Sequence, residues 1–504
     1  MLSQLPSNNA VQIAVAIGLT AAVGLATWLT IRRANHDGSK KDVFLAGGGL
    51  SWVFIAGAIT LTNLSTDQLV GMNGNQMALL AWWEIAGFAG LLILAFVFVP
   101  IYYRNNCTTV TELLEQRYGG RSIRTLISAM FLLGNILIFL PTVLYSGGTF
   151  MQALFGDALP VLGYAIALAV ISAGYTILGG LRAVAVMDTY SGVGILGLAL
   201  LIVILALAAV DFDLSGVPAE RLTMIGSADS PIPFHTLFTG MLFIQIYYWS
   251  TNQNITQKAM AAPSVTEAQK GVIAAAIVRI LIVPPIVVIP GIAAYKLFGD
   301  VGDAAYGQLI ATVLPPWLSG VFAAMVAAAV ITTFSAVLNS SVALYSVDFH
   351  EQIFGEVKDH WRLAAIVSIL LTVSAILLST VYVNQANADP TEFSIINLVQ
   401  QLFGLLSMPI LSAFVAGLLF RNVGAPAAIG GVVWGVALYG AFTFQQQMID
   451  ALGLAISPPV TMHYIDFMVV TLVTSILAAL IVNRVVLGNR AEFIGFGRGK
   501  ARAA

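Results

Sequence analysis

Thirteen apolar segments, each long enough to cross a lipid bilayer, constrain this chain more than any other feature of its sequence. A spanning α-helix needs about 20 mainly apolar residues. The segments lie near residues 11–31, 52–77, 79–103, 125–155, 159–179, 184–210, 234–256, 270–297, 316–347, 361–384, 393–420, 425–446 and 460–486. Because only 9% of the residues are charged and 59% are hydrophobic, no soluble domain could bury this surface. We therefore predict an all-α polytopic membrane protein.

The basic residues predict how the chain is oriented. Nineteen of the 22 lysines and arginines, Lys258 among them, fall in alternate loops or in the C-terminal tail. Basic loops remain in the cytoplasm, so we expect the N-terminus outside and the C-terminus inside. Segment 11–31 is longer than the apolar part of a signal peptide and lacks a basic leader, which predicts a retained span. The expected location is the cell (inner) membrane, with several passes through it.

Several function classes find no support in the sequence. The single cysteine, Cys107, excludes a disulfide framework and a cysteine metal cluster. A net charge of −2 gives no electrostatic case for nucleic acid. We find no nucleophile elbow, P-loop or dinucleotide fingerprint, so we do not expect an enzyme. The sequence indicates no obligatory protein partner, and the bilayer is the expected environment.

A polar stretch interrupts the second apolar segment. "LTNLSTDQLVGMNGN", residues 61–75, places an aspartate, amides and hydroxyls near the centre of the span. An aspartate there costs about 2.5–3.5 kcal/mol. Gly71 and Gly74 weaken the helix, and broken helices at mid-membrane are where secondary transporters bind ions and solutes. Polar contacts between helices are the alternative explanation, but the density of polar residues favours a binding site.

Two more stretches carry polar groups. "YYWSTNQNITQ", residues 247–257, combines aromatic residues with amides, which suits a sugar ring with its apolar face and polar rim, although aromatic residues also anchor spans at the interface. "AAAVITTFSAVLNSS", residues 327–341, contains the adjacent Thr332 and Thr333. Their hydroxyls, together with free carbonyls, are ligands that Na⁺ would take. The alternative is that these hydroxyls bond only their own helix backbone.

Three charged residues in or beside spans each leave two interpretations open. Asp188 is either an acid at a helix start or a group that helps a cation leave. Arg279 either extends towards the cytoplasmic interface or belongs to a site. Glu84 is either a gate for a ligand or a residue of the membrane interface.

The two polar-interrupted spans also predict an internal repeat. Spans 2–6 and 7–11 form five-span blocks of opposite orientation, and each block opens on an amide-rich stretch. Inverted repeats of this kind are typical of secondary transporters. The predicted units are 1–50 (an extra span and linker), 51–210 (first repeat), 211–233 (outer loop), 234–420 (second repeat) and 421–504 (two spans and a basic tail).

Three stretches taken together resemble the solute:sodium symporter family, in particular its bacterial sodium/sugar branch. They are "NLSTDQLVGMNG", "YYWSTNQNITQKAMAAPSVTEAQKG" and "VFAAMVAAAVITTFSAVLNS", and the resemblance covers about residues 40 to 425. It implies a LeuT-like 5+5 inverted repeat with one extra N-terminal and two extra C-terminal helices. It also implies a sodium site made of the carbonyls of Leu61, Leu64 and Ala329 and the hydroxyls of Thr332 and Thr333.

The resemblance further implies the groups that would contact the solute. The substrate-binding set is Asn63, Asp67, Gln68, Glu84, Gln245, Tyr248, Asn252, Arg279 and Gln400. Tyr248 would be the inner gate, and Met72 and Trp83 the outer lid. Asp188, with two hydroxyls, would serve a second sodium or sodium exit, but Ala336 stands where one of those hydroxyls would be. Phe139 stands where sugar symporters can show an asparagine.

The sequence thus predicts sodium-coupled import of a small polar solute by alternating access, with a monosaccharide as the first expectation. Alternatives are a polyol, nucleoside or carboxylate as the solute, and protons as the coupling ion through Asp67. A non-transporting sensor on the same fold is a further alternative. It is disfavoured because only about eighteen residues follow Val486, too few for a signalling domain.

Overall fold

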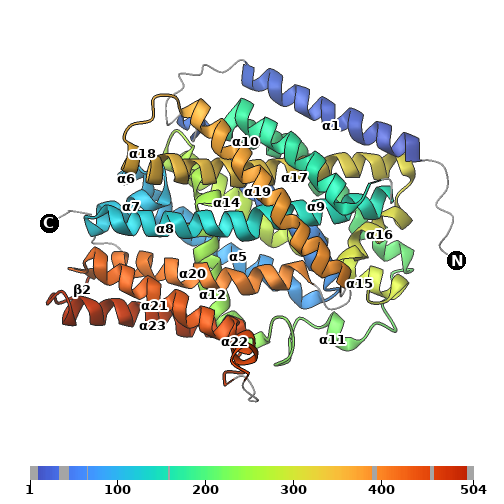
Figure 1. The fold of residues 1–504 in the computed structure, drawn as a ribbon. Helices are drawn as coiled ribbons and strands as arrows, with labels where there is room; N and C mark the ends of the chain where they lie inside the picture. The colour runs from blue at the N-terminus through green and yellow to red at the C-terminus, as the bar shows by residue number, and fades with distance from the viewer. Residues whose placement is uncertain are drawn as a thin grey trace.

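The computed structural model describes residues 9–32, 45–64, 66–156, 159–388, 394–453 and 459–495. This part of the chain is almost entirely α-helical (Figure 1). Ten of its helical segments are long and apolar enough to cross a membrane, and two shorter apolar helices accompany them. The predicted all-α polytopic class is therefore confirmed, whereas the number of spans and the sides of the two termini remain predictions.

The long helices pack side by side around a deeply buried centre. In the most apolar 18-residue stretch of the segment that contains α17 (Pro316–Ala343), 89% of the residues are buried. In the corresponding stretch of α1 (Asn9–Arg32), 17% are buried. In Figure 1, α1 lies along one edge of the bundle, and α21 (Ala425–Thr443) and α23 (Tyr464–Val485) lie along the opposite edge. Because α1 is apolar on nearly all its exposed surface, lipid is the medium it suits.

Both amide-rich segments are interrupted helices, as predicted. The second span consists of α3 (Trp52–Asn63) and α4 (Thr66–Gly74), and Leu64 at the break has non-helical φ −77° and ψ 60°. The seventh span consists of α12 (Gly240–Ile246), a π-helical turn η6 (Tyr247–Thr251) and α13 (Gln253–Met260). Asn252, between η6 and α13, is extended, with φ −79° and ψ 124°. Each break frees backbone groups from the helical hydrogen-bond pattern.

Other spans contain π-helical turns or, in α10, a kink. The remaining membrane helices are α5 (Trp82–Ile93), η3 (Leu94–Phe98), α6 (Val99–Arg104), α8 (Arg121–Gly134), η4 (Asn135–Phe139), α9 (Leu140–Phe155), α10 (Val161–Ala209), α14 (Val265–Leu281), α15 (Val283–Phe298), η8 (Leu344–His350), α19 (His360–Ala388) and α20 (Ile395–Leu419). The predicted segments 159–179 and 184–210 are the two halves of α10, which meet where Gly180 takes φ 53° and ψ −153°.

Short elements connect the spans. They are α7 (Val110–Tyr118), α11 (Ala219–Leu222), η7 (Gly302–Ala304), α16 (Ala305–Val313), α18 (Glu351–Phe354) and α22 (Gln445–Ala451), together with the 3₁₀ turns η1 (Ala46–Gly48), η2 (Ala78–Ala81) and η5 (Phe234–Phe238). A two-residue antiparallel pair joins β1 (Phe420–Arg421) after α20 to β2 (Glu492–Phe493) after α23. The predicted repeat and unit boundaries remain predictions.

Candidate functional site

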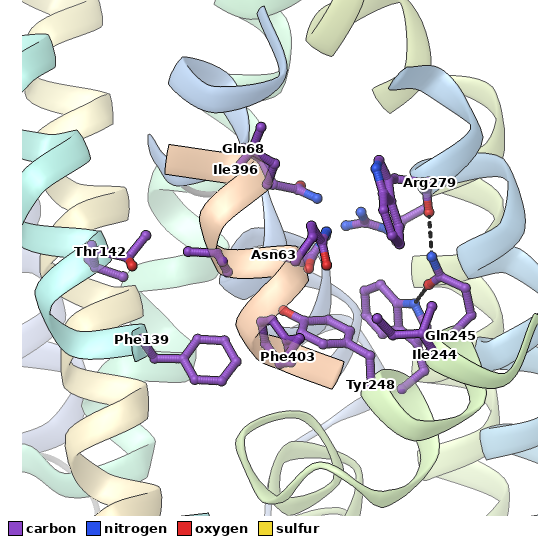
Figure 2. A pocket seen from close by; sticks show the side chains of 15 residues that line it. Asn63, Gln68, Phe139, Thr142, Ile244, Gln245, Tyr248, Arg279, Ile396 and Phe403 are labelled. Atoms are coloured by element: carbon purple, nitrogen blue, oxygen red, sulfur yellow. Dashed lines mark hydrogen bonds between the residues drawn. The ribbon is translucent and has the colours of Figure 1, made fainter. Parts of the chain in front are cut away.

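A cavity lies where the two interrupted helices meet, with a volume of about 60 Å³ (Figure 2). Its walls come from α3, α4, α12 and η6, together with α5, α9, α14 and α20. The lining residues are Asn63, Gln68, Trp83, Phe139, Thr142, Val143, Ile244, Gln245, Tyr248, Trp249, Arg279, Ile396, Val399, Gln400 and Phe403. Seven of them were predicted from the sequence as substrate-binding or gate residues: Asn63, Gln68, Trp83, Gln245, Tyr248, Arg279 and Gln400.

One wall of the cavity is a connected polar network centred on Asn63, the last residue of α3. In the amide orientation that satisfies its neighbours, Asn63 Nδ2 donates to the Tyr248 hydroxyl at 2.7 Å. Its Oδ1 accepts from Gln68 Nε2 at 2.8 Å and from Arg279 Nη1 at 2.9 Å. Because Asn63 stands at one break and Tyr248 at the other, this hydrogen bond joins the two interrupted helices directly.

Glu84 supports this wall from behind, although it does not line the cavity. Gln68 Nε2 donates to Glu84 Oε1 at 2.7 Å, and Arg279 Nη2 donates to Glu84 Oε2 in a buried ion pair. Arg279 is 1% exposed and Glu84 is 0% exposed. Both residues are therefore buried beside the cavity: Arg279 does not extend to the membrane surface, and Glu84 is not an interface residue. The pair neutralises the guanidinium charge at the cavity.

Gln245 and Trp249 form a second polar unit beside Arg279. Gln245 Nε2 donates to the Trp83 carbonyl at 3.0 Å, and Trp249 Nε1 donates to Gln245 Oε1 at 2.9 Å. The Arg279 guanidinium lies 4.7 Å from the centre of the Trp249 ring, a cation–π contact. Gln245 is thus fixed by both of its amide atoms, which places its carboxamide at the cavity edge.

Glycines on α5 allow Gln245 and Trp249 to pack closely against that helix. A Cβ at Gly90 would stand 2.5 Å from the Gln245 carbonyl oxygen, and one at Gly87 would stand 3.0 Å from Trp249 Nε1. Ser250 Oγ also donates to the Gly90 carbonyl at 3.1 Å. Any side chain at Gly90 would therefore push the π-helical turn away from α5.

The opposite wall of the cavity is aromatic and aliphatic. The rings of Phe139 and Phe403 pack edge to face with 4.6 Å between their centres, and the centres of the Phe403 and Tyr248 rings are 6.1 Å apart (Figure 2). Ile396 and Val399 from α20 continue this surface. A solute in the cavity would therefore face hydrogen-bonding groups on one side and ring surfaces on the other.

The residues predicted to bind sodium lie on the two elements that would form the site. Leu61 and Leu64 are buried at the break, and α17, which carries Ala329, Thr332 and Thr333, packs against both α3 and α4. Thr332 Oγ1 donates to the Ala329 carbonyl at 3.2 Å, as the alternative of backbone bonding anticipated. Thr333 Oγ1 is buried and makes no hydrogen bond within the described residues. A buried hydroxyl without a partner is costly, and a cation would supply one.

Several predicted residues lie elsewhere. Asn252 does not line the cavity: its side chain caps α13 by accepting from the Asn254 N–H at 3.0 Å, so its place in the substrate-binding set remains a prediction without support from this geometry. Met72 is buried in α4 but does not line the cavity, so it does not close over it in this structure. Asp67 lies on α4, but its side chain is outside the described part of the chain, so its role remains a prediction.

Asp188 and Lys258 form a buried contact that the sequence did not indicate. Asp188 lies two turns after the kink at Gly180, so it does not begin a helix. Lys258 Nζ lies 3.4 Å from Asp188 Oδ2, and both side chains are fully buried. Counting Lys258 as a loop cation was therefore wrong, because the residue lies within α13 and its side chain is buried.

The sequence reasoning missed several cavity residues. Trp249 lies against the Arg279 guanidinium and Phe403 against the Phe139 ring, yet neither differs in the sequence from an ordinary apolar residue of a membrane helix. Thr142, Ile396 and Val399 carry no signal beyond their apolar context. Trp249 follows Tyr248 in the amide-rich stretch, and that adjacency is the one sequence signal that could have identified it.

The chain is similar to known membrane transport proteins along most of its length. The sequence model of the Sodium:solute symporter family matches residues 43–435. A protein of Escherichia coli (strain K12), named uncharacterized symporter YidK, is 34% identical over 457 residues, covering 86% of this chain and 78% of that protein. The sodium/glucose cotransporter of Vibrio parahaemolyticus is 29% identical, covering 83% of this chain and 82% of that protein.

More distant relatives and solved structures agree with these matches. The human sodium/myo-inositol cotransporter 2 is 26% identical, covering 83% of this chain and 67% of that protein. A solved Na⁺-coupled sialic acid symporter in an outward-open state superimposes with a TM-score of 0.78 at 19% sequence identity, covering 96% of this chain and 99% of that one. At that identity the likeness concerns the fold, which is the LeuT-like fold expected from the sequence.

Proposed function

The chain belongs to the sodium:solute symporter family, and from this premise we propose that it imports a small neutral polyhydroxylated solute, first of all a monosaccharide, together with sodium. Sodium-coupled transport is the activity of the family. The observation that carries the proposal is the hydrogen bond between Asn63 and Tyr248, which joins the two helix breaks at the wall of the cavity. A site shared by two interrupted helices can change shape when either one moves.

The charge balance of the site supports a neutral solute. Arg279 is the cation that lines the cavity within the described residues, and Glu84 already pairs with it. An anionic solute would have to compete with a buried carboxylate for that guanidinium, whereas hydroxyl groups can exchange hydrogen bonds with Asn63, Gln68 and Gln400 without moving a charge. A carboxylate solute is thereby disfavoured relative to a sugar or a polyol.

The aromatic wall supports a ring-shaped solute. Phe139, Phe403 and Tyr248 give the C–H face of a sugar a surface to pack on, while the polar wall faces its hydroxyls. Phe139 offers ring surface where an asparagine would offer a hydrogen bond, so recognition depends more on the polar wall at α3, α4 and α14. A cyclic polyol is the second candidate, because it has the same neutral hydroxylated character and one relative is named for myo-inositol.

Sodium would bind between the break in the second span and α17, as the sequence predicts. The Thr333 hydroxyl, which has no hydrogen-bond partner among the described residues, supports this placement, and Thr332 Oγ1 can still coordinate a cation through a lone pair while it donates to the Ala329 carbonyl. A cation there holds α3 and α4 against α17 and so favours the arrangement in which Asn63 and Gln68 face the solute. Sodium and solute then raise each other's affinity, which is reciprocal coupling.

The transport cycle follows from this coupling. The membrane potential adds about 2.3 kcal/mol per charge per 100 mV to inward sodium movement. With both ligands bound, the helix pair formed by α3/α4 and α12/α13 moves relative to α9, α10, α17 and α19. Tyr248 then leaves its contact with Asn63, which opens the cavity on the other side of the membrane.

Uptake into proteoliposomes tests this function. The purified protein is reconstituted, and radiolabelled glucose, galactose, myo-inositol and sialic acid are offered under an inward sodium gradient or with choline in place of sodium. We expect sodium-dependent accumulation of at least one neutral compound and little of the anionic sialic acid. Accumulation that is equal in choline would contradict sodium coupling, and accumulation of sialic acid alone would contradict the neutral solute.

A further inference from the structure

Lys258 connects three elements below the cavity, on the side predicted to face the cytoplasm. From α13, its Nζ donates to the Ala58 carbonyl on α3 at 3.0 Å and to Asp188 Oδ2 on α10 at 3.4 Å. Both charged side chains are fully buried. A buried ammonium and carboxylate are stable only as a pair, so moving α3 and α13 together away from α10 requires a new partner for each charge.

The contact stands beside the predicted sodium site. Ala58 precedes Leu61 by three residues, which places the two carbonyls about 4.5 Å apart along the α3 axis. Helices α3 and α10 approach each other closely here: a Cβ at Gly57 would stand 2.6 Å from Thr189 Oγ1, and a Cβ at Gly192 would stand 2.8 Å from Leu61 Cδ2. Lys258 therefore fixes the part of α3 that would hold sodium.

A sodium ion leaving this site towards the cytoplasm would meet a fixed positive charge within about one helical turn. Asp188 is a buried carboxylate that can receive it there, and the Lys258 ammonium already lies against its Oδ2. An arriving sodium would take the place of the ammonium at Asp188, and Lys258 would then release the Ala58 carbonyl as it withdrew.

We propose that Lys258 is an inner latch, whose ammonium holds α3 against α10 and competes with departing sodium for Asp188. This inference rests on the proposed sodium coupling and adds a residue that couples sodium release to opening. Lys258 contacts neither sodium nor solute in the arrangement described, so it acts as a positioning residue. A purely structural pair would stabilise the protein in the same way but would leave its response to sodium unchanged.

Thermal unfolding of the full-length protein in nanodiscs, titrated with sodium against choline at constant ionic strength, tests the proposal. The variants are Lys258→Met, which removes the charge at similar length, Lys258→Arg, which keeps it, and Lys258→Met combined with Asp188→Asn. We expect Lys258→Met to unfold at a lower temperature in choline and to gain more from sodium than the wild type does. Its half-saturating sodium concentration should be about tenfold lower, because a nearby like charge is gone.

Lys258→Arg and the double variant show whether a changed sodium response comes from the charges of Lys258 and Asp188. Lys258→Arg should keep the wild-type sodium response. The double variant should lose the extra gain from sodium, because the negative charge that would recruit the ion is removed. If Lys258→Met and the double variant both respond to sodium as the wild type does, the latch is refuted while the proposed function stands. If the wild type itself shows no response to sodium in binding or in uptake, the proposed function is what fails.

A labelling experiment measures the opening directly. In a Cys107→Ser background, Ala58→Cys places a thiol on the buried face of α3, and its rate of reaction with a membrane-permeant maleimide reports separation from α10. Adding Lys258→Met should raise that rate about tenfold in choline, by loss of the latch, and sodium should lower it again. An unchanged rate would overturn the proposal even if the thermal data were obscured by poor folding.

Discussion

Arg279 on α14 and Glu84 on α5, 195 residues apart in the sequence, form a buried ion pair in which Arg279 lines the cavity and Glu84 lies behind it. The pair keeps a guanidinium at the cavity without leaving a net charge there. Gln68 and Asn63 bond to its two members, so the orientation of the polar wall depends on it.

Breaking this pair should destabilise the protein and slow uptake. Glu84→Gln leaves the Arg279 charge buried without its partner, which we expect to cost about 3–5 kcal/mol of stability and to reduce the initial rate of uptake at least tenfold. Thermal unfolding and initial-rate uptake in the same preparation measure the two effects. Combining Glu84→Gln with Arg279→Met should recover stability but not uptake, since the polar wall is then missing.

Glu267→Gln is the matched control for that experiment. Glu267 is on the same helix as Arg279, but its pairing with Lys270 is at the protein surface, where ion pairs contribute little. Both stability and uptake should stay near the wild-type values. Equal losses in Glu84→Gln and Glu267→Gln would show that the buried pair has no special role at the site.

Gly90 sets the distance between α5 and the π-helical turn, so adding one methyl group there should weaken solute binding. In Gly90→Ala the Cβ would overlap the Gln245 carbonyl, displacing Gln245 and Trp249, at a cost of about 1–3 kcal/mol. We expect the KM for the solute to rise about tenfold. Gly197→Ala on α10, whose Cβ would meet no atom within 4 Å, should leave KM and stability unchanged. A normal KM in Gly90→Ala would contradict the role given to this contact.

Asp303, in the turn between α15 and α16 and outside the apolar spans, should make stability depend on pH. Burial raises the pKa of its carboxyl to about 7, and Oδ2 accepts from the Ile395 N–H at 3.3 Å and from the Tyr145 hydroxyl at 3.5 Å. An unfolded aspartate titrates near 3.9. The Asp303 carboxyl therefore binds its proton more tightly in the native state than in the unfolded state. The resulting stabilisation of the native state is fully present below about pH 3.9 and is lost as the pH rises to 7.

The measurement is the unfolding temperature between pH 5 and pH 8. Between pH 5 and 7 this carboxyl should remove about 1.4 kcal/mol of stability per pH unit, and the slope it contributes should vanish above pH 7. Asp303→Asn should flatten that slope and make the protein more stable relative to wild type at pH 8 than at pH 5. Asp300→Asn, at the exposed neighbour paired with Arg221, should not. The same slope in wild type and Asp303→Asn would refute the assignment.

The interruption of two spans was predictable because the sequence carries it locally. Amides, hydroxyls and glycines within 61–75 and 247–257 disfavour a continuous apolar helix, and both segments are broken in the structure. The lining residues at those breaks, such as Asn63 and Tyr248, follow from the same signal. Residues on unbroken helices were reached through the family resemblance, and Arg279 and Gln400 do lie at the cavity.

Partner choice within the bundle could not be predicted from the sequence. Asn252 and Lys258 are close in sequence to Tyr248, yet one caps α13 and the other contacts Ala58 on α3 and Asp188 on α10, which depends on how α13 packs against those helices. Likewise, the pairing of Glu84 with Arg279 depends on how α5 and α14 pack. A charged residue in a span shows that a partner is needed, but not which one it is.

The account depends most on the sodium site between the break in the second span and α17, and the double variant Thr332→Ala, Thr333→Ala tests it most directly. Thr372→Ala is the control, since Thr372 is likewise buried in a membrane helix and bonds only its own backbone, to the Ser368 carbonyl at 2.7 Å. Solute uptake into proteoliposomes is compared with sodium and with choline outside. We predict that the sodium-driven part of uptake disappears in the double variant and persists in Thr372→Ala. Sodium-driven uptake that survives undiminished in the double variant would contradict the site and the coupling scheme that rests on it.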